Sequence, residues 1–129
     1  MKKKFNKEIG NLGEGLACRF LENRGFKIIQ RNYRRRFGEI DIIAQKGSSI
    51  RFIEVKSIQS DFTEYVSRES RGYRPEELVN PRKLHKISLV ANEYMASQSN
   101  ELDFQIDVAA VFIDKKRRTA RIRLTENVC

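Results

Sequence analysis

Two stretches of the chain repeat apolar residues at three- and four-residue steps, which predicts amphipathic helices. The first ends before Gly25, a typical helix stop, and its apolar positions are Ile9, Leu12, Leu16, Ala17, Phe20 and Leu21. The second begins at Asn80-Pro81, where asparagine suits the N-cap and proline suits the first helical position. Its apolar face would consist of Leu84, Ile87, Ala91 and Tyr94.

Five shorter stretches predict strands. A short strand is expected at FKII (26–29), and GEIDIIAQ (38–45) and IRFIEVKS (50–57) read as a β-hairpin around KGSS. FQIDVAAVFI (104–113) is apolar on both faces towards its end, as a central strand is, whereas TARIRL (119–124) alternates like an edge strand. The order predicts an α/β fold: one domain over residues 1–129, with a mixed sheet of about five strands flanked by helices.

The stretch 57–79 shows no clear period and is long for an ordinary connection, so we expect a mobile loop there. Its arginines and tyrosines include Arg68, Arg71, Arg74, Tyr65 and Tyr73. A solvated loop and a substrate-binding flap explain this composition equally well.

The predicted hairpin carries carboxylates where hydrophobic residues are expected. With the turn centred between Gly47 and Ser48, Asp41 faces Glu54 and Glu39 faces Lys56, all on one face of the sheet. Directly opposed side chains are about 5 Å apart, where two carboxylates repel by about 3 kcal/mol at an effective dielectric constant near 20. Something must offset this repulsion.

Two explanations are open from the residues alone. A divalent cation such as Mg²⁺ would bind two carboxylates, a backbone carbonyl and waters. Alternatively, a surface lattice of ion pairs would join Glu39 to Lys56 and Asp41 to a nearby arginine. The apolar residues that flank the acids indicate that both strands are central and well covered, which favours the cation.

The charge of the chain points to a polyanion as partner. Lys and Arg total 26 against 17 for Asp and Glu, a net charge of +9 in 129 residues, although excess charge also serves solubility. Two basic clusters are expected in turns and would hold phosphates without reading sequence: Arg31, Arg34, Arg35, Arg36; and Lys115, Lys116, Arg117, Arg118. The start MKKKFNKEIG is not followed by an apolar stretch, and no run could span a bilayer, so we expect a cytoplasmic protein without membrane contact.

Asp41 followed by Glu54-Val55-Lys56 resembles the PD-(D/E)xK nuclease motif, and IDIIA with FIEVKS is similar to archaeal Holliday-junction resolvases. A larger ordered set resembles the YraN-like (UPF0102) family of predicted endonucleases. Its members here are Gly13-Glu14, Arg31-Asn32, GEIDIIA, FIEVK, Pro81-Arg82-Lys83 and FQIDVAAV. The resemblance implies a restriction-endonuclease-like fold. Ile40 stands where the motif name has proline.

The resemblance also implies roles for individual residues. Asp41, Glu54 and the Val55 carbonyl would ligate Mg²⁺ or Mn²⁺, and Lys56 would orient or stabilise the attacking hydroxide. Glu14 matches a helical glutamate that approaches the same site, where Gly13 and Gly15 suggest close packing. Two further residues have roles that the resemblance leaves less defined. Glu39 is read as a partner of Lys56 or as an acid behind the metal ligands, and Lys83 as a contact to the scissile phosphate or a plain surface lysine.

The predicted function is a metal-dependent nuclease that acts on DNA, with branched or junction DNA as one substrate class. Two other readings stay open: a nucleic-acid-binding module that keeps the fold without cleavage, and an RNA- or ribosome-associated factor. A homodimer also stays open.

Overall fold

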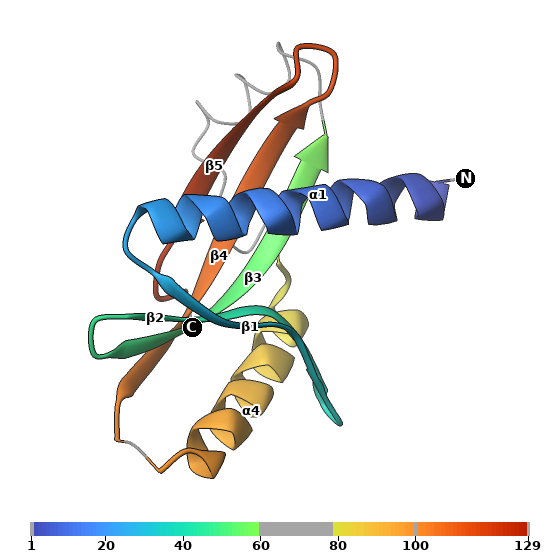
Figure 1. Cartoon of the computed structure of the whole chain (residues 1–129). Helices are drawn as coiled ribbons and strands as arrows, with labels where there is room; N and C mark the ends of the chain where they lie inside the picture. The colour runs from blue at the N-terminus through green and yellow to red at the C-terminus, as the bar shows by residue number, and fades with distance from the viewer. Residues whose placement is uncertain (1, 60–78, 100, 129) are drawn as a thin grey trace.

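The computed structural model describes residues 2–59, 79–99 and 101–128. Its elements in chain order are α1 (Lys2–Asn23), β1 (Lys27–Arg35), β2 (Gly38–Lys46), β3 (Ser49–Gln59), α4 (Pro81–Ser97), β4 (Asp103–Asp114) and β5 (Thr119–Thr125) (Figure 1). None of the described helices is long and apolar enough to cross a membrane.

The five strands form one mixed sheet in the order β1-β2-β3-β4-β5. Neighbouring strands pair antiparallel except β3 and β4, which run parallel with α4 in the connection between them. The predicted mixed sheet of five strands flanked by helices is therefore confirmed.

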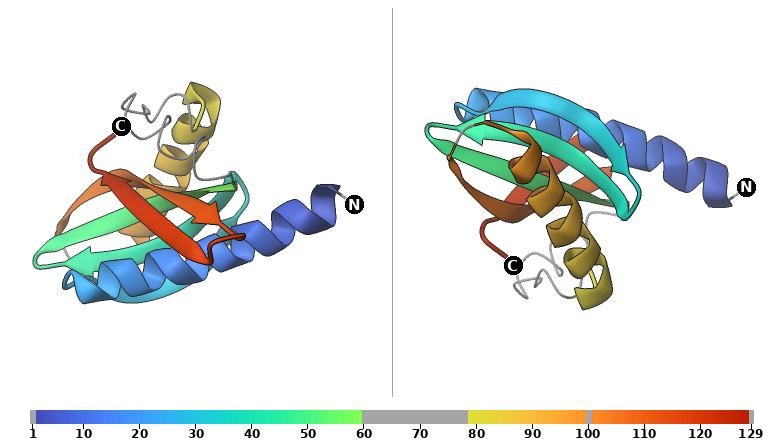
Figure 2. Two further views of the ribbon diagram at one scale, coloured as in Figure 1. Left: turned by 90° about the horizontal axis from the view of Figure 1, so that it is seen from above. Right: turned by 90° about the horizontal axis from the view of Figure 1, so that it is seen from below.

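The two helices cover opposite faces of the sheet (Figure 2). On the α1 side the core includes Leu21, Ile42, Ile53 and Val111. On the α4 side Phe52 and Ile87 are buried, and the Tyr94 ring meets Tyr33 and Phe52 edge to face at 5.4 and 5.5 Å between centroids. The central strands β2 and β3 are thus covered on both sides, as their apolar residues predict.

Helix α4 begins as its sequence predicts. The Asn80 side chain accepts a hydrogen bond from the Lys83 N–H at 2.8 Å, and Pro81 occupies the first turn. This capped start places Lys83 in the first turn of α4.

Two predicted boundaries are wrong. Strand β1 continues to Arg35 rather than ending at residue 29, because an edge strand with mostly exposed side chains does not need the apolar residues by which strands are recognised. Strand β3 also runs beyond its predicted end at Ser57, because Ile58 and Gln59, expected in the loop, pair with Phe112 and Ile113 of β4. The remaining part of that predicted loop, residues 60–78 with its arginines and tyrosines, lies outside the described residues.

Candidate metal centre and nucleic-acid-binding surface

The β2–β3 hairpin has the register that its sequence predicts. Gly47 takes a positive φ of 60° in the turn, and the strand pairing runs from Lys46–Ser49 to Ile42–Ile53. Asp41 and Glu54 follow directly on the two strands. The carboxylates therefore arrive from neighbouring strands at the same level of the sheet.

At this level the Asp41 side chain, in place of a backbone carbonyl of β2, accepts a hydrogen bond from β3. The Val55 N–H donates to Asp41 Oδ2 at 2.8 Å. Ile40 packs on the α4 side of the sheet and Ile42 on the α1 side, although residues two apart on a regular strand face the same way. Strand β2 thus turns over at Asp41, which brings this side chain to the backbone of β3.

Glu54 is a buried acid with few partners. Its side chain is 10% exposed, Oε2 lies 3.4 Å from Lys83 Nζ, and Oε1 has no hydrogen-bond partner among the described residues. Burial, and then the charge and hydrogen bond of Asp41, raise the pKa of Glu54 from 4.5 to about 8, against the opposing effect of Lys83. Burial also raises the pKa of Asp41, while the hydrogen bond from Val55 lowers it. Near neutral pH the carboxyl group of Glu54 therefore keeps its proton.

Helix α1 brings Glu14 to this site. Its side chain is 17% exposed, and Oε1 lies 3.7 Å from Arg31 Nη2. Burial first, and then the charge of Asp41, raise the pKa of Glu14, so the two carboxylates lie within electrostatic range. A Cβ at Gly13 would come within 2.9 Å of Ser57 Cβ, which shows the close packing expected there, whereas nothing lies within 4 Å of that position at Gly15.

Lys56 and Glu39 are not brought together. Lys56 lies two residues beyond Glu54 on the same face of β3; it is exposed and has no ion pair among the residues that the structure describes. Glu39 instead lies 3.4 Å from Arg34 of β1. The expected pairing is wrong because β2 leaves β3 beyond Asp41 but stays paired with β1, where Arg34 is opposite Glu39.

Asn32 is a neighbour of the site to which sequence reasoning assigns no role. It lies within β1 with a φ of 53°. Asparagine is one of the few residue types other than glycine that adopt this conformation, so an asparagine in a polar strand is the signal that could have found it.

The first basic cluster lies on a strand rather than in a turn, which corrects the expectation. Arg31, Arg34 and Arg35 belong to β1, and only Arg36 lies in the turn to β2. Arg35 stacks over the Tyr33 ring at 4.0 Å. An edge strand can present such a row of cations to a polyanion because its outer side chains are exposed.

The second basic cluster, Lys115–Arg118, forms the exposed turn between β4 and β5, as predicted. Since β3 is antiparallel to β2 and parallel to β4, this turn and the β1–β2 turn belong to the same end of the paired strands. The two turns nevertheless lie apart, at the top and at the lower right of Figure 1. Glu54 is level with Val108, six residues before Asp114, which puts the β4–β5 turn about 20 Å along the sheet from the carboxylates.

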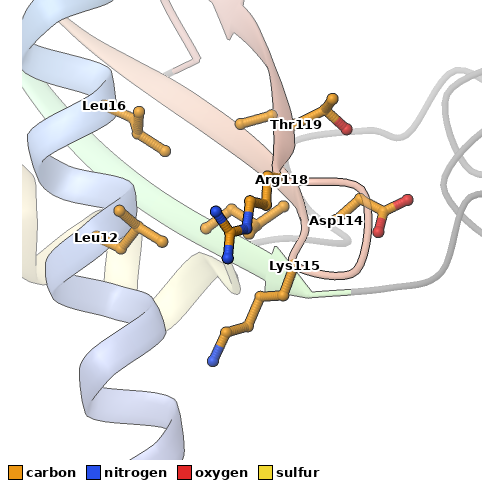
Figure 3. A pocket seen from close by; sticks show the side chains of 8 residues that line it. Leu12, Leu16, Asp114, Lys115, Arg118 and Thr119 are labelled. Carbon is orange, nitrogen blue, oxygen red and sulfur yellow. The ribbon is translucent and has the colours of Figure 1, made fainter.

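A pocket of about 510 Å³ lies beside this second turn. Leu12 and Leu16 of α1 face Lys115 and Arg118 across it (Figure 3). No predicted catalytic residue lines the pocket. It is therefore separate from the carboxylate site.

The residues at the site fit Mg²⁺ or Mn²⁺. The unpartnered Glu54 Oε1 beside a second carboxylate is the observation that suits a cation, and all donors are oxygens, with the Val55 carbonyl as the predicted third ligand. Within the described ranges, no three His, Cys, Asp or Glu side chains are placed to hold a metal. Mg²⁺ suits this sparse set because it keeps several waters and takes one or two carboxylates.

The fold and this acid pair define a small α/β protein with an oxygen-rich site on its central strands. The chain belongs to the uncharacterised protein family UPF0102, whose family model matches residues 13–111, and the predicted resemblance to this family is confirmed. A UPF0102 protein of Alkaliphilus metalliredigens is 40% identical over 116 residues, 88% of this chain and 93% of the relative. UPF0102 proteins of Campylobacter lari and Syntrophomonas wolfei are 35% and 34% identical, over 92% and 85% of this chain and 91% and 89% of theirs.

Proposed function

We propose that this protein is a metal-dependent nuclease that hydrolyses phosphodiester bonds in DNA, with branched or junction DNA as one substrate class. The observation that carries the proposal is the pair formed by the buried Glu54 and the half-buried Asp41, which costs free energy unless a cation or a proton offsets its charge. A surface that only binds a polyanion has no need for such a pair, because the carboxylates would repel the phosphates.

Four side chains of this protein have distinct roles in the proposed hydrolysis. A bound Mg²⁺ would supply charge stabilisation at the scissile phosphate. Asp41 and Glu54 would hold this cation, and Glu54 would lose its proton on binding it. Lys56, exposed on the same face as Glu54, is free to orient the attacking water. Lys83 Nζ lies 3.4 Å from Glu54 Oε2, close enough to the carboxylates to contact the scissile phosphate.

The basic clusters supply the binding surface for DNA. The distance of about 20 Å between the carboxylates and the β4–β5 turn corresponds to roughly six nucleotides of one strand in a duplex. Lys115–Arg118 would therefore contact phosphates well away from the scissile bond, while the arginines of β1 contact those nearer to it. Contacts of this kind fix position without reading sequence.

A cleavage panel tests the proposal. Single-stranded, duplex, flap and four-way DNA, and the matching RNA, are incubated with the protein and Mg²⁺ or Mn²⁺. We expect metal-dependent cleavage that Asp41→Asn and Glu54→Gln abolish and that Glu93→Gln, an exposed substitution on α4, leaves intact. Binding without cleavage of any substrate would favour the non-catalytic module, and cleavage of RNA alone would overturn the assignment to DNA.

A further inference from the structure

Strand β1 turns over at Asn32. Arg31 forms its ion pair with helix α1, whereas Tyr33, two residues on, packs against helix α4 on the other face. The left-handed backbone of Asn32, with φ of 53°, makes this change of face. In the β1–β2 register Asn32 falls opposite Asp41, so both strands turn over at the level of the candidate metal site.

The side-chain amide of Asn32 also bridges two carboxylates. With its nitrogen turned towards them, it donates to Glu14 Oε1 at 3.1 Å and to Glu39 Oε1 at 3.2 Å. The hydrogen-bond partners determine this orientation, because in the opposite one the amide oxygen would face two carboxylate oxygens. Arg31 and Arg34 hold the same two carboxylates at 3.7 and 3.4 Å.

We propose that Asn32 is a positioning residue, whose amide holds the carboxylates of Glu14 and Glu39 beside Asp41. The expected effect of Asn32 on catalysis rests on the proposed nuclease function, whereas its two hydrogen bonds do not depend on that function. The charge of Glu39 raises the pKa of Asp41, and the charge of Asp41 raises the pKa of Glu14. Without the two donated hydrogen bonds less would offset the repulsion between the two carboxylates, and Glu14 would be held at the site by its ion pair with Arg31 alone.

Two substitutions separate the amide from the backbone conformation. Asn32→Gly removes the amide and keeps the left-handed backbone, because glycine adopts positive φ without strain. Asn32→Asp keeps the shape but replaces the donors by a third carboxylate. We expect kcat for DNA cleavage to fall about 10- to 100-fold in Asn32→Gly, the range typical of residues that orient ligands, and further in Asn32→Asp, with KM unchanged.

Asn127 provides the matched control. It is also an asparagine with positive φ, 56°, and the contact it makes to Asp107 uses its backbone N–H, which glycine retains. Asn127→Gly should therefore leave kcat unchanged. A comparable loss of kcat in both glycine variants would overturn the specific role of the Asn32 amide.

A double-mutant cycle with Glu14→Ala tests whether Asn32 acts through Glu14. If it does, Asn32→Gly has little further effect once Glu14 is removed, whereas equal factors in both backgrounds overturn the proposal. The same cycle is measured on Mn²⁺ affinity and on the thermal unfolding midpoint without metal, neither of which needs cleavage. In a chain that cleaves nothing, coupling in these two measurements would refute the nuclease and retain the positioning role, whereas additivity in both would overturn the positioning role as well.

Discussion

Replacing Glu54 by glutamine should stabilise the metal-free protein, and the gain should grow with pH. Glu54 is buried beside Asp41, which raises its pKa from 4.5 to about 8. Between these two pH values the unfolded chain ionises Glu54 while the folded protein keeps it protonated. The folded state then binds more protons than the unfolded state, so its free energy of unfolding falls as pH rises. Glutamine cannot ionise and still has an N–H group to donate to Asp41.

The structure sets the size of this effect. At 1.36 kcal/mol for each pH unit, the rise from 4.5 to about 8 corresponds to as much as about 5 kcal/mol, reached at pH 8 and above. At pH 7 the difference between the variant and the parent is about 3 kcal/mol, since the pH is then about 2.5 units above 4.5. Such a difference moves the midpoint of thermal unfolding by roughly 10 °C in a domain of this size.

The assay is thermal and urea unfolding from pH 5 to pH 9 in the presence of EDTA, because a bound cation would stabilise the parent and hide the effect. The parent and Glu54→Gln should have similar stability at pH 5 and diverge towards pH 8. Glu93→Gln, on the exposed face of α4, should follow the parent. Two parallel curves for the parent and Glu54→Gln would refute the reasoning, since Glu54 would then not be an acid that burial and Asp41 keep protonated.

Three further outcomes are expected. Calorimetry should detect Mn²⁺ binding that disappears in Asp41→Asn and in Glu54→Gln, and unchanged binding in both would exclude the metal site. Lys56→Ala should lower the cleavage rate at least about 100-fold with DNA affinity within a few fold, whereas a parallel loss of both would make Lys56 a phosphate anchor. Replacing Arg34–Arg36 by alanine should flatten the dependence of log affinity on log salt by up to about 3 units on duplex DNA, and an unchanged slope would place this cluster away from the bound DNA.

Sequence reasoning succeeded where side chains obey a period. The apolar steps of α1, the capped start at Asn80 and the alternation of β2 and β3 are local patterns, and with a short turn they are enough to fix which residues face each other. The same register places Asp41 beside Glu54 without any structure.

Sequence reasoning failed where a single side chain changes the course of a strand. The Asp41 side chain accepts a hydrogen bond from the Val55 N–H, and beyond this residue β2 no longer pairs with β3. Glu39 therefore forms its ion pair with Arg34 and not with Lys56. No periodic pattern in the sequence predicts that two strands separate at such a residue. The length of β1 was missed for a related reason, because a strand at the edge of a sheet is held by backbone hydrogen bonds that any polar sequence can make.

The hydrogen bond from the Val55 N–H to Asp41 makes one rung of the backbone ladder depend on a side chain. An alanine at position 41 would therefore break the sheet locally and leave a partly buried N–H without an acceptor, at a cost of about 1–3 kcal/mol, in addition to deleting a ligand. An asparagine keeps an oxygen for that rung. The amide proton of Val55 should accordingly exchange with solvent faster in the alanine variant than in the asparagine variant. Loss of activity on removal of Asp41 can be read as chemistry only in the asparagine variant, where this rung is preserved.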